Sequence, residues 1–342
     1  MNKKISVIIP CYNVEQYIDR CFDCLENQTI GIDNMEIILI NDASTDNTLD
    51  KLSDFEQRYP ESVILINFEE NRRQAAARNI AIEYASAPYI GYMDSDDSID
   101  YSMYESMITY IEQYDCDFVQ CRFDCIDGDT NLGVSKPFNP DGYLDLSNQA
   151  TYSQFIAPRV GLVSVCDKVY KRSFLVDNDI YCPEQVICED IFFSFLVFTY
   201  AESTYSTNEV FYHYHTNPNS TLHTKKNDYY IDVMNVCLDY LRVCTERRLI
   251  DKRRETIDWL FLEKYYVYML WEIFHEFPEI AYSTYKEMRE TILELVPDYK
   301  NNSYRNIAGN EFDDIMLKLL DYDFSEIQFT QLAGNMMNKF NI

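Results

Sequence analysis

Four short apolar runs near the start of the chain, rich in β-branched residues, restrict its possible folds more than any other feature of the sequence. They cover residues 5–10, 36–40, 63–67 and 89–93. Continuous apolar runs of this length are typical of strands that are buried on both faces of a sheet. Segments with helical periodicity separate them, at residues 14–27, 48–58 and 75–84. This order predicts an α/β fold in which helices flank a mostly parallel sheet.

Polar segments follow these runs and mark an expected binding edge. Ligands of open α/β sheets bind outside the carboxyl ends of the strands. The predicted strands are followed by polar residues at 11–13, 41–46, 71–73 and 94–98. We therefore expect the functional residues in these four segments, and this expectation does not depend on any family resemblance.

Length and pattern together predict two domains. At 342 residues, the chain exceeds a typical single domain. Mixed elements continue to about residue 225, and helical periodicity then persists to the end. We expect an α/β domain at residues 1–225 and an all-helical domain at 226–342. The sequence leaves open whether the second domain binds a substrate, forms an oligomer or lies near a membrane.

The charge balance excludes some partners. The chain has 57 acidic and 29 basic side chains, and its net charge of −28 opposes general binding to nucleic acid or to an anionic membrane surface.

Eleven irregularly spaced cysteines and an N-terminus unlike a signal peptide predict reduced thiols in a cytoplasmic protein. Cys21 and Cys24 are expected to be buried within a helix. The most apolar stretch, residues 265–271, is far shorter than the roughly 20 residues that span a bilayer.

Three carboxylates follow the fourth predicted strand directly, at Asp94, Asp96 and Asp97. Hard oxygen ligands at such a position suit Mg²⁺ or Mn²⁺ that bridges to phosphate oxygens, although a solvated acidic turn is the alternative. A calcium-binding EF-hand loop is excluded, because Ile99 stands where the loop needs a glycine and a strand precedes the segment.

The first turn of the sheet lacks the glycines that hold phosphates in many nucleotide-binding proteins. It reads Pro10-Cys11-Tyr12-Asn13, and neither a G-x-G-x-x-G nor a G-x-x-x-x-G-K-[ST] motif occurs in a chain with only 8 glycines. Phosphates must therefore be held in another way. A divalent metal on Asp96 and Asp97, together with a cation such as Arg78, would do so.

Four motifs in the expected order carry a family resemblance. They are the segments Ser6–Asn13, Glu36–Asp46, Ala77–Asn79 and Met93–Asp97. Together they resemble family 2 of the inverting glycosyltransferases, which have the GT-A fold, and the resemblance extends over about residues 3–225. It implies that Tyr12 lies against the nucleotide base, that Asp42 hydrogen-bonds the uracil ring and that Arg78 approaches the nucleotide. It further implies that Asp96 holds the ribose or shares the metal and that Asp97 is the main metal ligand. The full nucleotide-sugar-binding set that we expect is Pro10, Tyr12, Asn13, Asp42, Arg78, Asp96, Lys168 and His215.

Two positions depart from the pattern of that family. Ala43 and Arg73 stand where the family often has glycine. The first change removes backbone freedom, and the second adds a cation near the expected donor site.

A second set of motifs concerns the acceptor. The segment Ile187–Phe193 resembles the Glu-Asp motif of the family, which implies that Asp190 is the catalytic base and that Glu189 contacts the acceptor. A base is needed because a sugar hydroxyl is a poor nucleophile until its proton is removed. An acidic pair that interacts with a helix dipole is the alternative. His215 or His213 is expected to contact the diphosphate or to be structural.

The resemblance thus implies a metal-assisted hexosyl- or N-acetylhexosaminyltransferase. It would move a sugar with inversion from a UDP-sugar to a carbohydrate or lipid-linked saccharide acceptor, using Mn²⁺ or Mg²⁺. A nucleotidyltransferase on a related sheet and a catalytically silent partner subunit are the alternatives. A basic cluster in the helical domain would either approach a membrane at its inner face, bind an anionic polymer or form a solvated helix face; it comprises Arg242, Arg247, Arg248, Lys252, Arg253 and Arg254.

Overall fold

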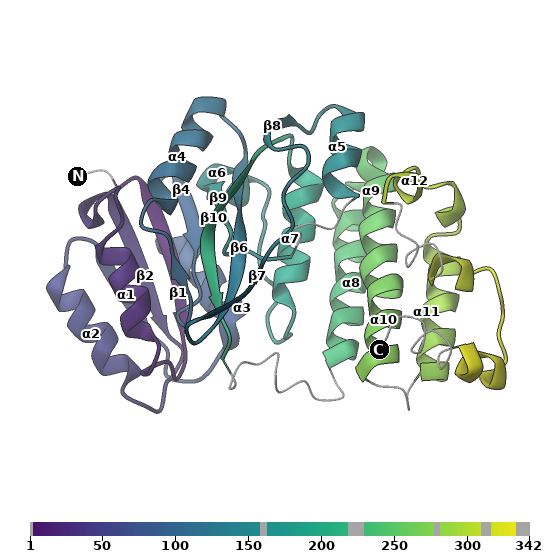
Figure 1. Cartoon of the computed structure of the whole chain (residues 1–342), viewed down its shortest axis with the longest axis horizontal. Coiled ribbons are helices and arrows are strands. Elements are labelled where there is room, and N and C mark those ends of the chain that lie inside the picture. Colours follow the sequence, from purple (N-terminus) through teal and green to yellow (C-terminus); the bar gives the residue numbers. More distant parts are fainter. Residues whose placement is uncertain (1–2, 158–162, 218–228, 277–280, 309–315, 333–342) are drawn as a thin grey trace. The chain divides into compact units, whose positions relative to one another are not determined.

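The computed structural model describes residues 3–157, 163–217, 229–276, 281–308 and 316–332. The chain divides into two compact units (Figure 1). The first contains Met1–Phe155 and Arg159–Thr224, and the second contains Ile156–Pro158 and Lys225–Ile342.

The first unit is built on a ten-stranded sheet with the order β3-β2-β1-β4-β9-β6-β10-β5, in which β7 pairs with β6 and β8 pairs with β10. Its strands are β1 (Ile5–Cys11), β2 (Met35–Asn41), β3 (Val63–Asn67), β4 (Tyr89–Tyr92), β5 (Ser98–Ile99), β6 (Phe118–Asp127), β7 (Thr130–Val134), β8 (Gly142–Asp145), β9 (Lys168–Lys171) and β10 (Ser203–His215). The first four are the predicted strands, and they pair in parallel. The second half is mixed, because β9 runs antiparallel to both β4 and β6.

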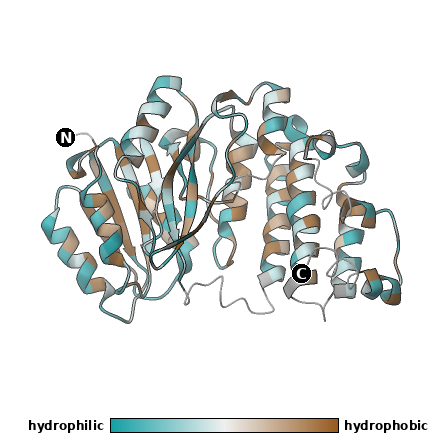
Figure 2. Cartoon of the chain, in the orientation of Figure 1, coloured by the Kyte–Doolittle hydropathy of each residue, from teal (hydrophilic) through white to brown (hydrophobic). Residues whose placement is uncertain are grey.

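Helices flank this sheet, which confirms the predicted fold class. They are α1 (Ile18–Glu26), η1 (Ile32–Asn34), α2 (Thr48–Arg58), α3 (Arg73–Tyr84), α4 (Met103–Tyr114), α5 (Gln149–Ile156), α6 (Arg172–Asp177) and α7 (Glu189–Tyr200). Figure 2 shows mainly hydrophobic colours along β1 and β2 and mixed colours on α1 and α2. Residues of β2 are buried throughout, as expected for a strand covered on both faces. Cys21 and Cys24 are free, buried thiols within α1, as the sequence predicts.

Helix α1 begins four residues later than the periodicity predicts, after a turn that is bonded to the loop before α2. The amide of Val14 donates to Thr48 Oγ1 over 2.8 Å, and the amide of Glu15 donates to Asp46 Oδ2 over 3.2 Å. The amide of Tyr17 donates to the carbonyl oxygen of Val14 over 2.9 Å and closes the turn. The turn connects the loop after β1 to the loop after β2.

Within the described residues of the second unit, the regular secondary structure is entirely helical, which confirms the predicted helical C-terminal region. Its elements are α8 (Tyr229–Glu246), α9 (Ile250–Phe261), the π-helix η2 (Leu262–Tyr268), α10 (Met269–Glu276), α11 (Ala281–Leu295), η3 (Tyr299–Asn301) and α12 (Tyr304–Ala308), and residues 316–319 and 326–332 are also helical. Large aromatic side chains fill its core, among them Trp259, Tyr266 and Tyr285. In the described residues, no helix has both the length and the apolar character to cross a bilayer.

Candidate functional site at the carboxyl edge of the sheet

The carboxyl ends of β1 and β2 are joined by hydrogen bonds between their loops. Asn13 Oδ1 accepts the amide of Thr45 over 2.8 Å, and the amide of Asn13 donates to Ser44 Oγ over 3.1 Å. Tyr12, beside Asn13, is 48% exposed. Ordinary packing does not explain so exposed a ring, and it leaves an aromatic surface on which a planar group can stack. Pro10, one residue before the end of β1, is partly buried.

Asp42 follows β2 and organises the loop that follows β3. Its side chain is buried, and Oδ1 accepts the amide of Arg72 over 2.6 Å. Its carbonyl oxygen accepts a bond from Asn71 Nδ2 over 3.3 Å. Asp42 therefore fixes the start of α3 against the end of β2, in addition to any contact that it makes with a ligand.

Three residues of these loops adopt left-handed backbone conformations. The φ angles are 52° for Asn13, 56° for Ala43 and 66° for Arg73. A residue with a Cβ atom is strained in this region, where glycine is not. Ala43 and Arg73 are the two positions at which the resembled family often has glycine, so the structure retains the turn geometry without the residue that favours it.

Arg78 joins two acidic motifs that are far apart in the sequence. Its side chain is 4% exposed, Nη1 donates to Glu189 Oε1 over 2.6 Å, and Nη2 donates to Asp94 Oδ1 over 3.0 Å. Gln74 Nε2 donates to the same Asp94 oxygen over 2.8 Å. Burial raises the pKa of Glu189, and the guanidinium of Arg78 opposes that rise. The guanidinium of Arg78 thus donates hydrogen bonds to two carboxylates of the protein. The family resemblance, by contrast, implies a contact between Arg78 and the nucleotide.

Asp97 is the most enclosed member of the acidic turn after β4. It is 1% exposed, Oδ2 accepts the hydroxyl of Tyr212 over 2.6 Å, and Oδ1 accepts the amide of His215 over 2.8 Å. Tyr212 also accepts the amide of Asp94 over 3.3 Å. Burial, followed by the charges of Asp94 and Asp96, raises the pKa of Asp97 well above its ordinary value. Both oxygens of Asp97 therefore hold the turn against β10.

Asp94 and Asp96 are less enclosed and retain oxygens that no described side chain contacts. Asp96 Oδ2 accepts Asn217 Nδ2 over 2.9 Å, and Arg20 donates to the backbone oxygen of Asp96. Burial raises the pKa of Asp96, and the neighbouring Asp94 raises it further. This concentration of partly buried negative charge fits a cation.

Within the described residues, no three His, Cys, Asp or Glu side chains are grouped so as to hold a metal ion. Mg²⁺ in phosphate sites is usually bound through one or two carboxylates, substrate phosphates and water. Asp94 and Asp96, which are more exposed than Asp97, fit such an arrangement.

Both histidines of the segment Tyr212–His215 have protein partners. His215 Nε2 lies 2.8 Å from Ser98 Oγ, and burial, with Arg20 nearby, lowers its pKa to about 4. The lowered pKa favours an uncharged, hydrogen-bonding His215 ring at neutral pH. His213 Nδ1 lies 2.7 Å from Asp124 Oδ1, on the neighbouring strand β6.

Lys168 is placed differently from the ligand contact that the sequence suggests. Its side chain is 1% exposed, and Nζ lies 2.7 Å from Asp167 Oδ1 and 2.6 Å from the carbonyl oxygen of Ser164. A buried ammonium needs such partners, because leaving water costs it a large free energy. The structure therefore gives Lys168 a buried ion pair.

Glu189 and Asp190 form the first turn of α7. Glu189 is buried, whereas Asp190 is partly exposed, and Asp190 Oδ1 accepts the amide of Ile191 over 2.9 Å. Nearly every residue from Ile191 to Thr199 is buried, so α7 is a core helix that presents its acidic first turn at one end. The two carboxylates thus differ in environment, with the more accessible one on Asp190.

Residues of α3 also hold the segment that precedes α7. Asn79 Nδ2 donates to the carbonyl oxygen of Cys182 over 2.8 Å, and the amide of Cys182 donates back to Asn79 Oδ1 over 2.9 Å. Arg73 Nη1 donates to the carbonyl oxygen of Gln185 over 3.3 Å. The motif Ala77-Arg78-Asn79 therefore connects the acidic turn after β4 to the acidic turn of α7.

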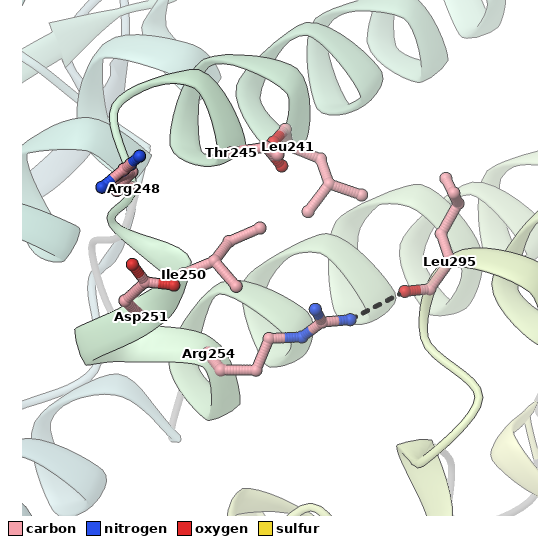
Figure 3. Close-up of a pocket in the computed structure, with 7 residues that line it drawn as sticks. All are labelled: Leu241, Thr245, Arg248, Ile250, Asp251, Arg254 and Leu295. Carbon is pink, nitrogen blue, oxygen red and sulfur yellow. Dashed lines mark hydrogen bonds between the residues drawn. The ribbon is translucent and has the colours of Figure 1, made fainter.

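A separate pocket lies in the second unit, next to part of the basic cluster (Figure 3). It has a volume of about 360 Å³ and is lined by Leu241, Thr245, Arg248, Ile250, Asp251, Arg254 and Leu295. Arg254 donates to Asp258 over 2.8 Å and to the carbonyl oxygen of Leu295 over 3.0 Å. Arg242 pairs with Asp239 and Glu246 on the same helix. These pairings are those of a solvated helix face, one of the three alternatives that the sequence leaves open.

The sheet order and the acidic turn after β4 define an α/β protein of the GT-A type. Residues 6–177 match the family described as Glycosyl transferase family 2. The chain belongs to this family.

Several known proteins are similar to this chain in sequence or in fold. The uncharacterized glycosyltransferase EpsJ of Bacillus subtilis is 29% identical over 217 residues, which are 63% of this chain and 62% of that protein. The poly(ribitol-phosphate) beta-glucosyltransferase of Bacillus spizizenii is 29% identical over 213 residues, 62% of this chain and 32% of that protein. The match thus spans less than two thirds of the length of either relative. S. aureus TarS 1–349, solved in complex with UDP-GlcNAc, has a TM-score of 0.69 and 18% identity, and the match covers 94% of both chains.

Proposed function

We propose that this chain transfers a sugar from a UDP-sugar to a hydroxyl group of a polysaccharide or another glycoconjugate, with inversion at the anomeric carbon. Family membership supports glycosyl transfer. One structural observation carries the proposal furthest: Arg78 brings the acidic turn after β4 and the acidic turn of α7 together. A transferase needs a donor site and an acceptor base close together. The complex of TarS with UDP-GlcNAc supports UDP as the nucleotide, and the name of the poly(ribitol-phosphate) beta-glucosyltransferase supports a polymer as the acceptor.

The donor site would lie over the loops after β1, β2 and β4. The exposed ring of Tyr12 would stack on the base, and the neighbouring loop at Asp42 would hold the base edge. Asn13 would keep these two loops together through its bonds to Thr45 and Ser44.

Mn²⁺ or Mg²⁺ would be held by Asp94 and Asp96, with Asp97 supporting the turn. This assignment shifts the main ligand from Asp97, favoured by the sequence, because both oxygens of Asp97 already accept protein hydrogen bonds. When bound, the metal would neutralise charge on the departing diphosphate. The raised pKa values of Asp96 and Asp97, caused first by burial, support a place for positive charge at this turn.

Asp190 would act as the general base. Its carboxylate would take the proton of the acceptor hydroxyl as that oxygen forms a bond to the anomeric carbon. The bond between the anomeric carbon and the diphosphate oxygen would break in the same step, and UDP would leave with the electron pair. Glu189 is buried against Arg78 and would orient the turn that carries Asp190.

The proposal is tested by UDP release from a panel of UDP-sugars, with Mn²⁺ and with EDTA. We expect one sugar to be turned over, with a rate that falls at least about 100-fold in Asp190→Asn, as for loss of a general base. Asp179→Asn, a change elsewhere in the same unit, serves as the control. Turnover that is unchanged in Asp190→Asn would contradict the assigned base, and failure of the wild type to bind UDP at all would contradict the donor class. Binding without turnover of any sugar would favour the silent-partner alternative.

A further inference from the structure

We propose that Arg78 is a positioning residue that couples the two sides of the site, so that Glu189 on α7 determines how firmly Arg78 holds Asp94. This inference rests on the proposed function, because it concerns the availability of Asp94 to a cation and a diphosphate. It assigns Glu189 a task on the donor side, although Glu189 belongs to the motif expected to serve the acceptor.

The geometry of the guanidinium carries the inference. One guanidinium group donates through Nη1 to Glu189 at 2.6 Å and through Nη2 to Asp94 at 3.0 Å. The side chains of Arg78 and Glu189 are 4% and 7% exposed, so water screens this ion pair little. The side chain of Asp94 is 32% exposed and is therefore the most accessible of the three. A single positive charge is therefore divided between two carboxylates, and a change at one must alter the hold on the other.

The backbone around the bridge is fixed independently of it. Asn79 and Cys182 exchange two hydrogen bonds, at 2.8 and 2.9 Å, between α3 and the segment before α7. Gln74, one turn before Arg78 on α3, also donates to Asp94 Oδ1. Removing one charge from the bridge is thus expected to redistribute the interactions of Arg78 without separating α3 from α7.

Glu189→Gln gives a prediction with a definite sign. Glutamine keeps the size and an acceptor oxygen of the side chain but removes its charge. Arg78 forms ion pairs with two carboxylates in the described residues, Asp94 and Glu189. Once Glu189 is replaced by glutamine, the ion pair with Asp94 is the one that remains. Arg78 holds Asp94 more firmly, and Asp94 competes less well for a cation. We expect Mn²⁺-dependent UDP binding to weaken about fivefold, the lower range of coupling between sites.

Calorimetric titration of UDP with and without Mn²⁺ provides the test, and its readout does not require turnover. A purely structural loosening would weaken UDP binding equally in both conditions. The coupling proposed here weakens binding only when Mn²⁺ is present. Glu112→Gln is the matched control, since it removes the same charge from an exposed residue of α4 whose ion pair with Lys4 is 3.4 Å long.

The outcomes separate this inference from the proposed function. Wild-type protein that does not bind UDP with Mn²⁺ would overturn both. Wild-type binding with an unchanged Kd in Glu189→Gln would overturn the coupling alone, as would an equal loss with and without Mn²⁺. If Glu189→Gln does not fold, Glu189→Asp applies the same test, because the shorter carboxylate retains the charge but lengthens the contact with Arg78. It should show a smaller, Mn²⁺-dependent loss, and no loss would overturn the inference.

Discussion

Arg78 donates to Glu189 over 2.6 Å, and this buried contact joins residues that lie 111 positions apart in the chain. It connects the third helix of the sheet region to the acidic first turn of α7. The same guanidinium reaches Asp94 after β4. One side chain thus links the segments to which we assign the donor and the acceptor chemistry.

Arg78→Met should strongly destabilise the first unit. The change leaves Glu189 and Asp94 without the cation that they share, and breaking a buried ion pair by removing one partner costs about 3–5 kcal/mol. The midpoint of denaturant unfolding should fall accordingly. Arg58→Met is the control, because the pair between Arg58 and Glu26 is largely exposed and should contribute at most about 1 kcal/mol. Equal effects of the two changes would contradict the importance of the bridge.

Ala43→Gly should stabilise the protein. Ala43 has a φ of 56°, where a residue with a Cβ atom is destabilised by about 1–2 kcal/mol. Glycine removes this strain, but it also increases the conformational entropy of the unfolded chain, which offsets part of the gain in stability. We expect a net gain of about 0.5–1 kcal/mol in thermal or denaturant unfolding. Ala81→Gly, within α3, should have the opposite sign because glycine weakens a helix interior. A loss of stability in Ala43→Gly would mean that the turn is not strained.

Tyr12→Ala should weaken UDP binding while leaving the fold intact. Stacking of a base on an aromatic ring contributes about 1–3 kcal/mol, so the Kd should rise about tenfold or more. The ring is 48% exposed, and little core packing is lost with it. Tyr12→Phe should bind almost as the wild type does. Tyr84→Ala, at an equally exposed ring on α3, should leave the Kd unchanged.

The free energy of unfolding should decrease in mild acid because of His215. Its pKa is about 4 in the folded chain, because burial disfavours the charged ring, against about 6.5 in an unfolded chain. Between these values the unfolded chain binds the extra proton, so the free energy of unfolding decreases as the pH falls from about 6.5 toward 4. His215→Gln should flatten this dependence in denaturant titrations across that range. An identical pH dependence in both proteins would show that the ring is not buried in its neutral form.

The strands of the first half of the sheet follow from the sequence, because β1 to β4 are continuous apolar runs with polar residues at their carboxyl ends. The later strands do not follow as readily. β9 is only four residues long and pairs antiparallel with both β4 and β6. This arrangement is set by contacts between distant parts of the chain and not by the local sequence pattern. The hydrophobic periodicity also does not give the start of α1, which follows a turn whose amides bond to the loop before α2.

The sequence identifies the acidic turns, but it does not show which of their carboxylates are buried and which are accessible. Asp96 and Asp97 are adjacent carboxylates, and only the position of Tyr212 on β10 shows that Asp97 is enclosed. The roles of Tyr212 and Asn217 were missed for the same reason, although both lie in or next to the Tyr-His-Tyr-His segment. Lys168 belongs to the nucleotide-sugar-binding set expected from the sequence, and the sequence gives no sign that its side chain pairs in the core with that of the preceding residue, Asp167.

In the proposed site, the diphosphate and its cation lie at the carboxyl edge of the sheet, over Asp94 and Asp96. Anomalous diffraction from crystals grown with UDP and Mn²⁺ tests it most directly. We predict one strong manganese peak within about 2.2 Å of an oxygen of Asp94 or Asp96, the usual length of such bonds, with the uracil against Tyr12. A peak bonded to Asp97 alone, or UDP bound away from β1, β2 and β4, would contradict the account.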